Sequence, residues 1–191
     1  LGPGLLGSVL DGTGRPLSRL AEQEGNFLST GTVATTLDRA RRWAFTPTAT
    51  VGARLAAGDE LGTVVENEGV VHRILVPPGV TGVLAELKAG SYSVEEPVGR
   101  LQDGTALTLL QRWPVRVPRP VARWLPADRP FVTGQRVFDF LFPVAEGGSV
   151  AVPGGFGTGK TVIEQSLAKH SMADIVVYVG CGERGNEMAD V

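Results

Sequence analysis

The first 110 residues alternate short apolar runs with polar positions and are interrupted at close intervals by Gly or Pro. Residues 62–66, 70–76 and 80–85 are rich in Val, Ile, Leu and Thr, which is typical of short strands. The sequence Pro77-Pro78-Gly79 predicts a tight turn between the last two runs. This pattern predicts a β-rich first domain.

Two stretches of this region resemble each other. Residues 57–62 begin with Ala-Gly and end with Leu-Gly, and residues 89–99 begin with Ala-Gly and end with Val-Gly. Each stretch follows an apolar run. A small β barrel or sandwich built from two similar halves would produce such an internal similarity. The alternative is that the similarity arises by chance.

Residues 113–130 carry five prolines interleaved with four arginines. Proline at this density excludes a helix interior and favours extended backbone, so we expect a stiff connector. Arginines beside Trp113 and Trp124 would alternatively suit a nucleic-acid surface. The net charge of −2 offers no general attraction to nucleic acid, and we therefore expect a solvated linker.

The remaining residues alternate helix and strand patterns. We predict helices over 135–142 and 161–169, and strands over 149–152 and 174–179. The last of these runs is apolar and mainly β-branched, as expected for a strand buried on both faces of a parallel sheet. The order of strand, Gly-rich loop, helix and strand predicts one βαβ unit.

Composition narrows the class of protein. The single cysteine, Cys181, cannot form an intramolecular disulfide, and two histidines offer no metal-ligand cluster. No apolar run approaches the roughly 18 residues that a membrane span needs, and we expect no signal peptide, because the first residues do not have its pattern. We expect a cytoplasmic protein that reaches a membrane only through partners. The first residue is not Met and residues 189–191 stop inside a predicted helix, so we expect a piece of a longer chain.

A complete phosphate-loop motif, G-x-x-x-x-G-K-[ST], lies between the predicted strand and helix. Its glycines allow successive N–H groups to point at phosphate oxygens, and the helix adds the positive end of its dipole. Lys160 is expected at the β- and γ-phosphates, and the Thr161 hydroxyl is the candidate Mg²⁺ ligand. A chance Gly-rich turn is the alternative, but the flanking strand and helix favour the loop. The predicted nucleotide-binding residues are Gly154, Gly155, Phe156, Gly157, Thr158, Gly159, Lys160, Thr161 and Val162.

Several segments resemble the catalytic A subunits of the V/A-type rotary ATPases. The most specific is Gly180-Cys-Gly-Glu-Arg-Gly-Asn-Glu-Met188, and the others are residues 155–157, 113–120, 133–137 and 2–12. The resemblance implies a mixed fold: a β-rich, barrel- or sandwich-like insert domain followed by the start of a RecA-like α/β phosphate-loop domain. It also implies that Glu183 polarises the attacking water and that Arg184 helps to stabilise the γ-phosphate.

Glu183 is a catalytic candidate on physical grounds as well. A carboxylate at the carboxyl end of a parallel strand, beside the phosphate loop, lies where such sheets bind their ligands. The alternative is a carboxylate that only stabilises a helix N-terminus. Lys160, Glu183 and Arg184 are therefore the predicted catalytic residues.

The resemblance further implies a division into four segments: a link (1–27), a β-rich insert or bulge domain (28–110), a connector (111–132) and an incomplete nucleotide-binding domain (133–191). F-type β subunits and flagellar export ATPases lack this insert. His72 and Tyr92 within it are expected to be ordinary surface or core residues rather than ligands.

Partners and cofactors are also implied by the resemblance. They are ATP or ADP with Mg²⁺, B subunits in an alternating A3B3 hexamer, and central and peripheral stalk subunits. The implied activity is ATP hydrolysis or synthesis coupled to proton or sodium transport, with the fragment alone inactive. The alternatives are another hexameric phosphate-loop motor, such as an export ATPase or an RNA helicase, and a structural module whose insert contacts stalk components.

Overall fold

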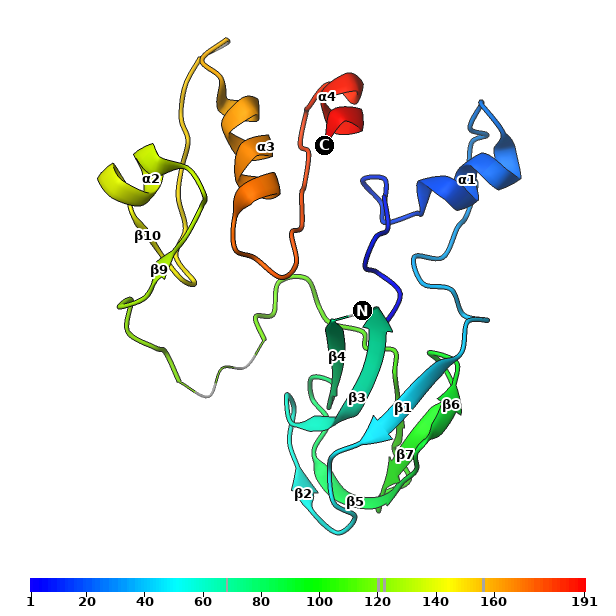
Figure 1. Ribbon diagram of the computed structural model, residues 1–191. Coiled ribbons are helices and arrows are strands. Elements are labelled where there is room, and N and C mark those ends of the chain that lie inside the picture. Colours follow the sequence, from blue (N-terminus) through cyan, green and yellow to red (C-terminus); the bar gives the residue numbers. More distant parts are fainter. Residues whose placement is uncertain (68, 120, 122, 156) are drawn as a thin grey trace. The chain divides into compact units, whose positions relative to one another are not determined.

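The structure is a computed structural model that describes residues 1–67, 69–119, 121, 123–155 and 157–191. The chain divides into two compact units, Leu1–Val121 and Ala122–Val191 (Figure 1). Each unit is described by itself. The four-segment division of the chain stays a prediction.

Two antiparallel four-stranded sheets form most of the first unit. In one, the strand order is β4-β3-β1-β6, with bounds β1 (Trp43–Pro47), β3 (Glu60–Asn67), β4 (Val70–Leu75) and β6 (Gly90–Tyr92). In the other it is β2-β5-β7-β8, with bounds β2 (Arg54–Leu55), β5 (Gly82–Leu87), β7 (Pro97–Leu101) and β8 (Ala106–Thr108). The three strands predicted from the sequence are confirmed as β3, β4 and β5. The predicted turn is also confirmed, since the Val80 N–H donates to the Pro77 carbonyl over 3.3 Å.

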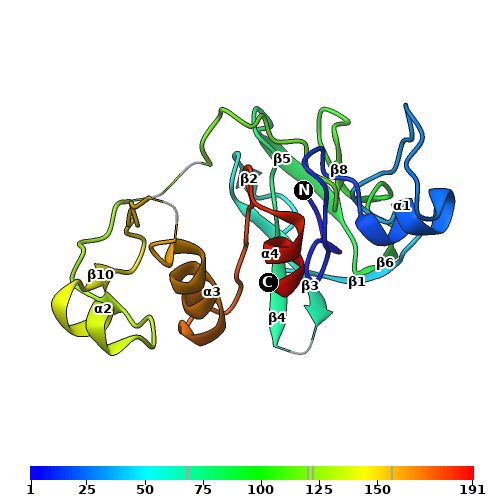
Figure 2. The same ribbon diagram turned by 90° about the horizontal axis from the view of Figure 1, so that it is seen from above.

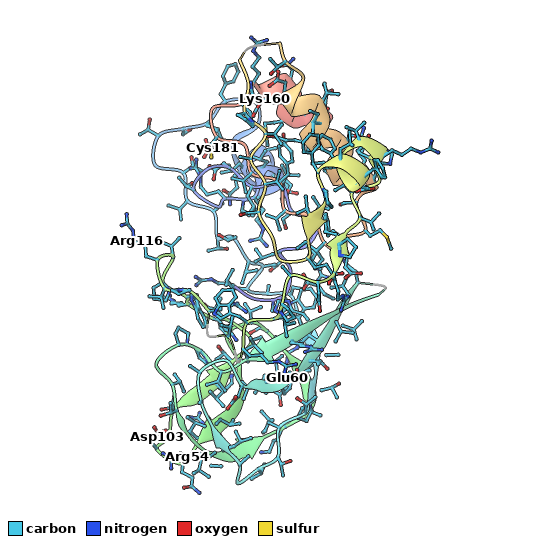
Figure 3. All side chains as sticks on the ribbon, turned by 90° about the vertical axis from the view of Figure 1, so that its left-hand side faces the viewer. Arg54, Glu60, Asp103, Arg116, Lys160 and Cys181 are labelled. Atoms are coloured by element: carbon cyan, nitrogen blue, oxygen red, sulfur yellow. The ribbon has the colours of Figure 1, made fainter. Side chains whose placement is uncertain are left out.

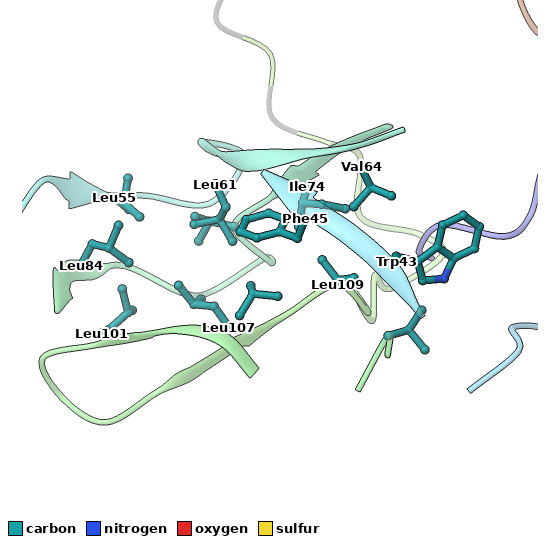
Figure 4. Close-up of a cluster of buried hydrophobic side chains, with 13 residues drawn as sticks. Trp43, Phe45, Leu55, Leu61, Val64, Ile74, Leu84, Leu101, Leu107 and Leu109 are labelled. Atoms are coloured by element: carbon teal, nitrogen blue, oxygen red, sulfur yellow. The ribbon is translucent and has the colours of Figure 1, made fainter. Parts of the chain in front are cut away.

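Apolar side chains from both sheets form one core (Figure 4). Alternate positions of β1 point inward, so that Trp43 and Phe45 are buried while Ala44 between them is exposed. Leu61, Leu84 and Leu107 add fully buried side chains from strands of both sheets. Removing such surface from water stabilises the fold by about 25 cal/mol per Å². The expected β-rich barrel or sandwich is therefore confirmed.

The two similar stretches, residues 57–62 and 89–99, end at Gly62 and Gly99. These two glycines have equivalent places in the two sheets. A Cβ on Gly62 would lie 2.4 Å from the Thr46 carbonyl oxygen, and a Cβ on Gly99 would lie 2.4 Å from the Glu86 carbonyl oxygen. A shift in ladder register falls just before each glycine. This equivalence supports the interpretation of two similar halves.

One helix of the first unit, α1 (Leu17–Glu24), was not predicted. Of its eight residues, all of them described, only Leu20 is buried. Leu17, Leu20 and Ala21 do have the i, i+3, i+4 spacing of an amphipathic helix. The eight residues are shorter than the window of about 11–18 residues over which such periodicity is read, so the pattern is easily overlooked.

The second unit contains a two-stranded ladder and three helices in its described residues. Strand β9 (Pro130–Phe131) pairs with β10 (Val144–Ala145), and the helices are α2 (Arg136–Leu141), α3 (Lys160–His170) and α4 (Gly185–Asp190). Helices α2 and α3 confirm the predictions for 135–142 and 161–169. The described residues of the connector before Pro130 contain no helix, as the proline density predicts. Across the described chain, no helix is both long and apolar enough to cross a membrane.

The strands predicted over 149–152 and 174–179 are absent. The prediction of a complete βαβ unit is therefore wrong for this structure. Both segments are irregular, and the chain on either side of α3 is drawn as coil in both views (Figures 1 and 2). A strand exists only where a neighbour completes its hydrogen-bonded ladder, and no described strand pairs with either segment. The expected burial is also wrong, since Val177 is 81% exposed.

Candidate phosphate-binding site

The loop before α3 has the backbone that its glycines allow. Gly157 and Gly159 have φ angles of +76° and +87°, in the left-handed region that other residues rarely adopt. Gly159 is the N-cap of α3, and its carbonyl accepts the Ile163 N–H over 3.0 Å. Phe156 lies outside the described residues. The described part of the motif therefore forms a turn that leads directly into the helix.

Gly154 lies where no side chain fits. A Cβ at this position would lie 2.5 Å from Thr158 Oγ1, and that hydroxyl donates to the Gly155 carbonyl over 2.9 Å. The loop therefore closes on itself through Thr158, which requires glycine opposite it.

Lys160 brings a positive charge to the same loop. Its ammonium donates to the carbonyls of Gly154 over 2.5 Å and of Gly155 over 2.7 Å. Lys160, which is labelled in Figure 3, is also the first residue of the 11-residue helix α3. The N–H groups of a first helical turn have no intrahelical acceptor and attract anions, so the loop and the helix offer a cation and free donors together. Thr161 and Val162 follow in this first turn.

A second set of glycines shapes the Gly180–Met188 segment. A Cβ on Gly180 would lie 2.4 Å from the Met188 sulfur and 3.4 Å from Glu183 Cγ, so the Met188 side chain packs directly on the Gly180 backbone and would have to move for any larger residue. Gly182 has a φ angle of +77°, and helix α4 begins at Gly185. Glu183 is therefore held on a tight turn before α4. Arg184 follows it as the N-cap residue of α4.

Glu183 has an unusual electrostatic environment. Its pKa is raised, first by a hydrogen bond with the Glu187 side chain and then by loss of solvation. The negative charges of Glu187 and Glu164 raise the pKa further, and the Lys160 ammonium opposes them. Two of the predicted catalytic residues, Lys160 and Glu183, thus lie within electrostatic range of each other.

Sequence reasoning missed three residues of this group: Glu164, Tyr178 and Glu187. The Tyr178 hydroxyl donates to Glu164 over 3.5 Å, and its pKa is raised by desolvation and then by the charges of Glu164 and Glu183. Glu187 is the third residue of α4, a position from which a Glu side chain commonly reaches back to the residues before the helix, and this was a usable signal. No comparable signal connects Glu164 with Tyr178.

The two units match two descriptions of one family. Residues 34–116 match the ATPsynthase alpha/beta subunit barrel-sandwich domain, and residues 134–191 match the ATP synthase alpha/beta family, nucleotide-binding domain. The chain belongs to the ATP synthase alpha/beta family. The expected fold class, a β-rich domain followed by the start of a nucleotide-binding domain, is confirmed.

Relatives within this family are similar along all 191 residues. The chain is 59% identical to the V-type ATP synthase alpha chain of Anaeromyxobacter dehalogenans (strain 2CP-C). It is 52% identical to the A subunit of the A-type ATP synthase of Methanosarcina mazei. It spans 33% of the length of each of these relatives. The resemblance is therefore confirmed: the chain is a segment of the A subunit of a V/A-type ATP synthase.

Proposed function

We propose that this chain is part of the catalytic A subunit of a V/A-type rotary ATPase. The subunit binds ATP or ADP with Mg²⁺ and couples ATP hydrolysis or synthesis to the transport of protons or, alternatively, sodium ions. The observation that carries the proposal is the geometry of the phosphate loop: Gly157 and Gly159 turn the backbone directly into α3, whose first residue, Lys160, brings its ammonium back to the loop. The segment Gly180–Met188, which relates the chain to these subunits, adds the Glu183 carboxylate within electrostatic range of Lys160.

The described residues fit Mg²⁺ as a partner of the nucleotide rather than as an independently bound ion. No group of three or more His, Cys, Asp or Glu side chains in the described chain is arranged to hold a metal. Thr161 supplies one hydroxyl beside Lys160 at the start of α3. This donor set suits Mg²⁺, which takes few protein ligands and is otherwise bound by phosphate oxygens and water. The ion would supply positive charge that neutralises the phosphate oxygens.

Each side chain has a defined part in the proposed reaction. The loop N–H groups bind phosphate oxygens, and Lys160 places its ammonium at the β- and γ-phosphates. Glu183 accepts a hydrogen bond from the attacking water and orients it in line with the bond that breaks. Arg184 stabilises the negative charge that develops on the γ-phosphate oxygens.

The proposal includes the surroundings of the catalytic subunit. Three A and three B subunits alternate in a cytoplasmic headpiece that reaches the membrane only indirectly, through stalk subunits, and the B subunit supplies an arginine finger. The chain then divides into a link (1–27), an inserted β-rich domain (28–110), a connector (111–132) and the start of the nucleotide-binding domain (133–191). The segment alone is not expected to hydrolyse ATP, because part of the site comes from the neighbouring subunit.

Replacing Lys160 with Ala tests the phosphate contact. In the complete subunit within its complex, the change should weaken binding of ATP by about tenfold or more, because a charge-assisted contact with phosphate is lost. Titration with a fluorescent ATP analogue measures the affinity. Lys169→Ala, at the other end of α3, is the matched control and should leave the affinity unchanged. Full-strength binding by Lys160→Ala would contradict the assignment.

Replacing Glu187 with Gln tests the environment of Glu183. A water-orienting carboxylate works in its ionised form, so hydrolysis declines as pH falls through its pKa. Because Glu187 raises the pKa of Glu183, removing its charge should lower that pKa and extend hydrolysis to lower pH. The acidic limb of the pH dependence of kcat/KM measures the change.

The control for this experiment is Asp190→Asn, which removes a carboxylate from the same helix. Its acidic limb should stay in place. A limb that does not move in Glu187→Gln, or that moves equally in both variants, would rule out the coupling of Glu183 with Glu187.

A further inference from the structure

A buried carboxylate stands at one end of the β-rich unit, far along the sequence from the phosphate loop. Glu66 lies on β3, and its side chain is only 3% exposed. Burial of an ionised carboxylate is costly unless its oxygens accept hydrogen bonds. The hydrogen-bond donors to Glu66 therefore identify the parts of the chain that this carboxylate binds.

Two of these donors are backbone amides near the start of the chain. Glu66 Oε1 accepts the Gly4 N–H over 2.6 Å and the Leu6 N–H over 3.4 Å. Figure 1 shows this end of the chain beside the ends of β3 and β4. The carboxylate thus binds a segment about 60 residues away in sequence.

The third donor is His72 on β4. Its Nδ1 lies 3.0 Å from Glu66 Oε2. The tautomer of His72 that carries a proton on Nδ1 donates it to this oxygen when Glu66 is ionised, because an ionised carboxylate only accepts hydrogen bonds. His72, which was expected to be an ordinary surface or core residue, therefore fixes the orientation of the Glu66 carboxylate.

The segment held by Glu66 packs closely on the unit through two glycines and a buried proline. A Cβ on Gly4 would lie 3.2 Å from Trp43, and Gly4 has a φ angle of +104°. A Cβ on Gly2 would lie 3.0 Å from Leu37 Cδ1, and Pro3 is fully buried. Glycine loses more conformational freedom on ordering than any other residue, so this segment needs a specific anchor.

We propose that residues 2–6 form a releasable strap across the β-rich unit and that Glu66, oriented by His72, is its catch. The strap fixes the direction in which the chain enters the unit. When Glu66 no longer accepts hydrogen bonds from the strap amides, the strap leaves the surface of the unit while the two sheets stay folded. This device does not depend on the nucleotide-binding function.

Hydrogen exchange of the intact chain, read at single amides by NMR, tests the strap. Glu66→Gln keeps the shape of the side chain but removes its charge, and should speed exchange at Gly4 and Leu6 by about tenfold or more, because hydrogen bonds to charged groups are the stronger ones. Amides of the core strands, such as that of Val64, should keep their protection. Glu60→Gln, at the other end of β3, is the matched control and should change neither strap amide.

His72→Phe provides a second variant that keeps a ring but removes the donor. It should speed exchange at Gly4 and Leu6 by a smaller factor than Glu66→Gln. Unchanged exchange at the strap amides in both variants would overturn the proposal. Loss of protection that is equal in the strap and in the core would also overturn it, because Glu66 would then support the whole unit rather than a separate strap.

Discussion

Hydrolysis of ATP should fall by a factor on the order of 10³ when Glu183 is replaced by Gln in the complete subunit within its complex. Glutamine has the same shape but cannot take up a proton and is a weaker acceptor for the attacking water. The phosphate loop and Lys160 are unchanged, so ATP should still bind. Single-turnover hydrolysis and equilibrium binding of ATP, measured on the same preparation, separate the two effects.

Glu187→Gln is the matched control for this prediction. It removes the neighbouring carboxylate but leaves Glu183 in place, so turnover above neutral pH should persist. Unchanged turnover in Glu183→Gln would remove the catalytic assignment. Loss of ATP binding in that variant would instead give Glu183 a structural part in the loop.

Stability of the β-rich unit should fall by roughly 2–4 kcal/mol when Gly62 is replaced by Ala. The new methyl group would lie 2.4 Å from the Thr46 carbonyl oxygen and 2.6 Å from the Phe45 ring. The carbonyl belongs to the paired strand β1, so relief requires movement of the ladder itself. Urea unfolding of the intact chain measures the change in the free energy of unfolding.

Gly12→Ala serves as the control, because no atom lies within 4 Å of the Cβ that it would introduce. Its effect should stay within about 0.5 kcal/mol. Gly99→Ala should behave like Gly62→Ala, since the two glycines are equivalent in the two sheets. Equal stability of the Gly62 and Gly12 variants would show that the close approach at Gly62 can be relieved without cost.

The phosphate loop could be predicted almost completely because its conformation is a local property. Glycine is required where φ is positive, and Gly157 and Gly159 occur at those positions in the motif itself. The start of α3 at Lys160 follows from the same few residues. The strands β3, β4 and β5 were also predictable, because alternation and turn residues are read within a short window.

The segment 174–179 shows where local pattern fails. Its composition is that of a buried parallel strand, yet strand formation depends on neighbours that the segment does not itself encode. Without a described partner strand it remains irregular and exposed. Helix α3 needs no such partner, because its hydrogen bonds are internal.

The sequence by itself determined the family, the phosphate loop and the β-rich character of the first unit, since each of these is written in adjacent residues. Only the tertiary structure decided which distant groups meet. It placed Gly4 on Glu66, brought Glu164 and Glu187 to Glu183, and gave Gly62 and Gly99 equivalent places. These contacts depend on strand pairing and packing across many residues, and no local pattern carries that information.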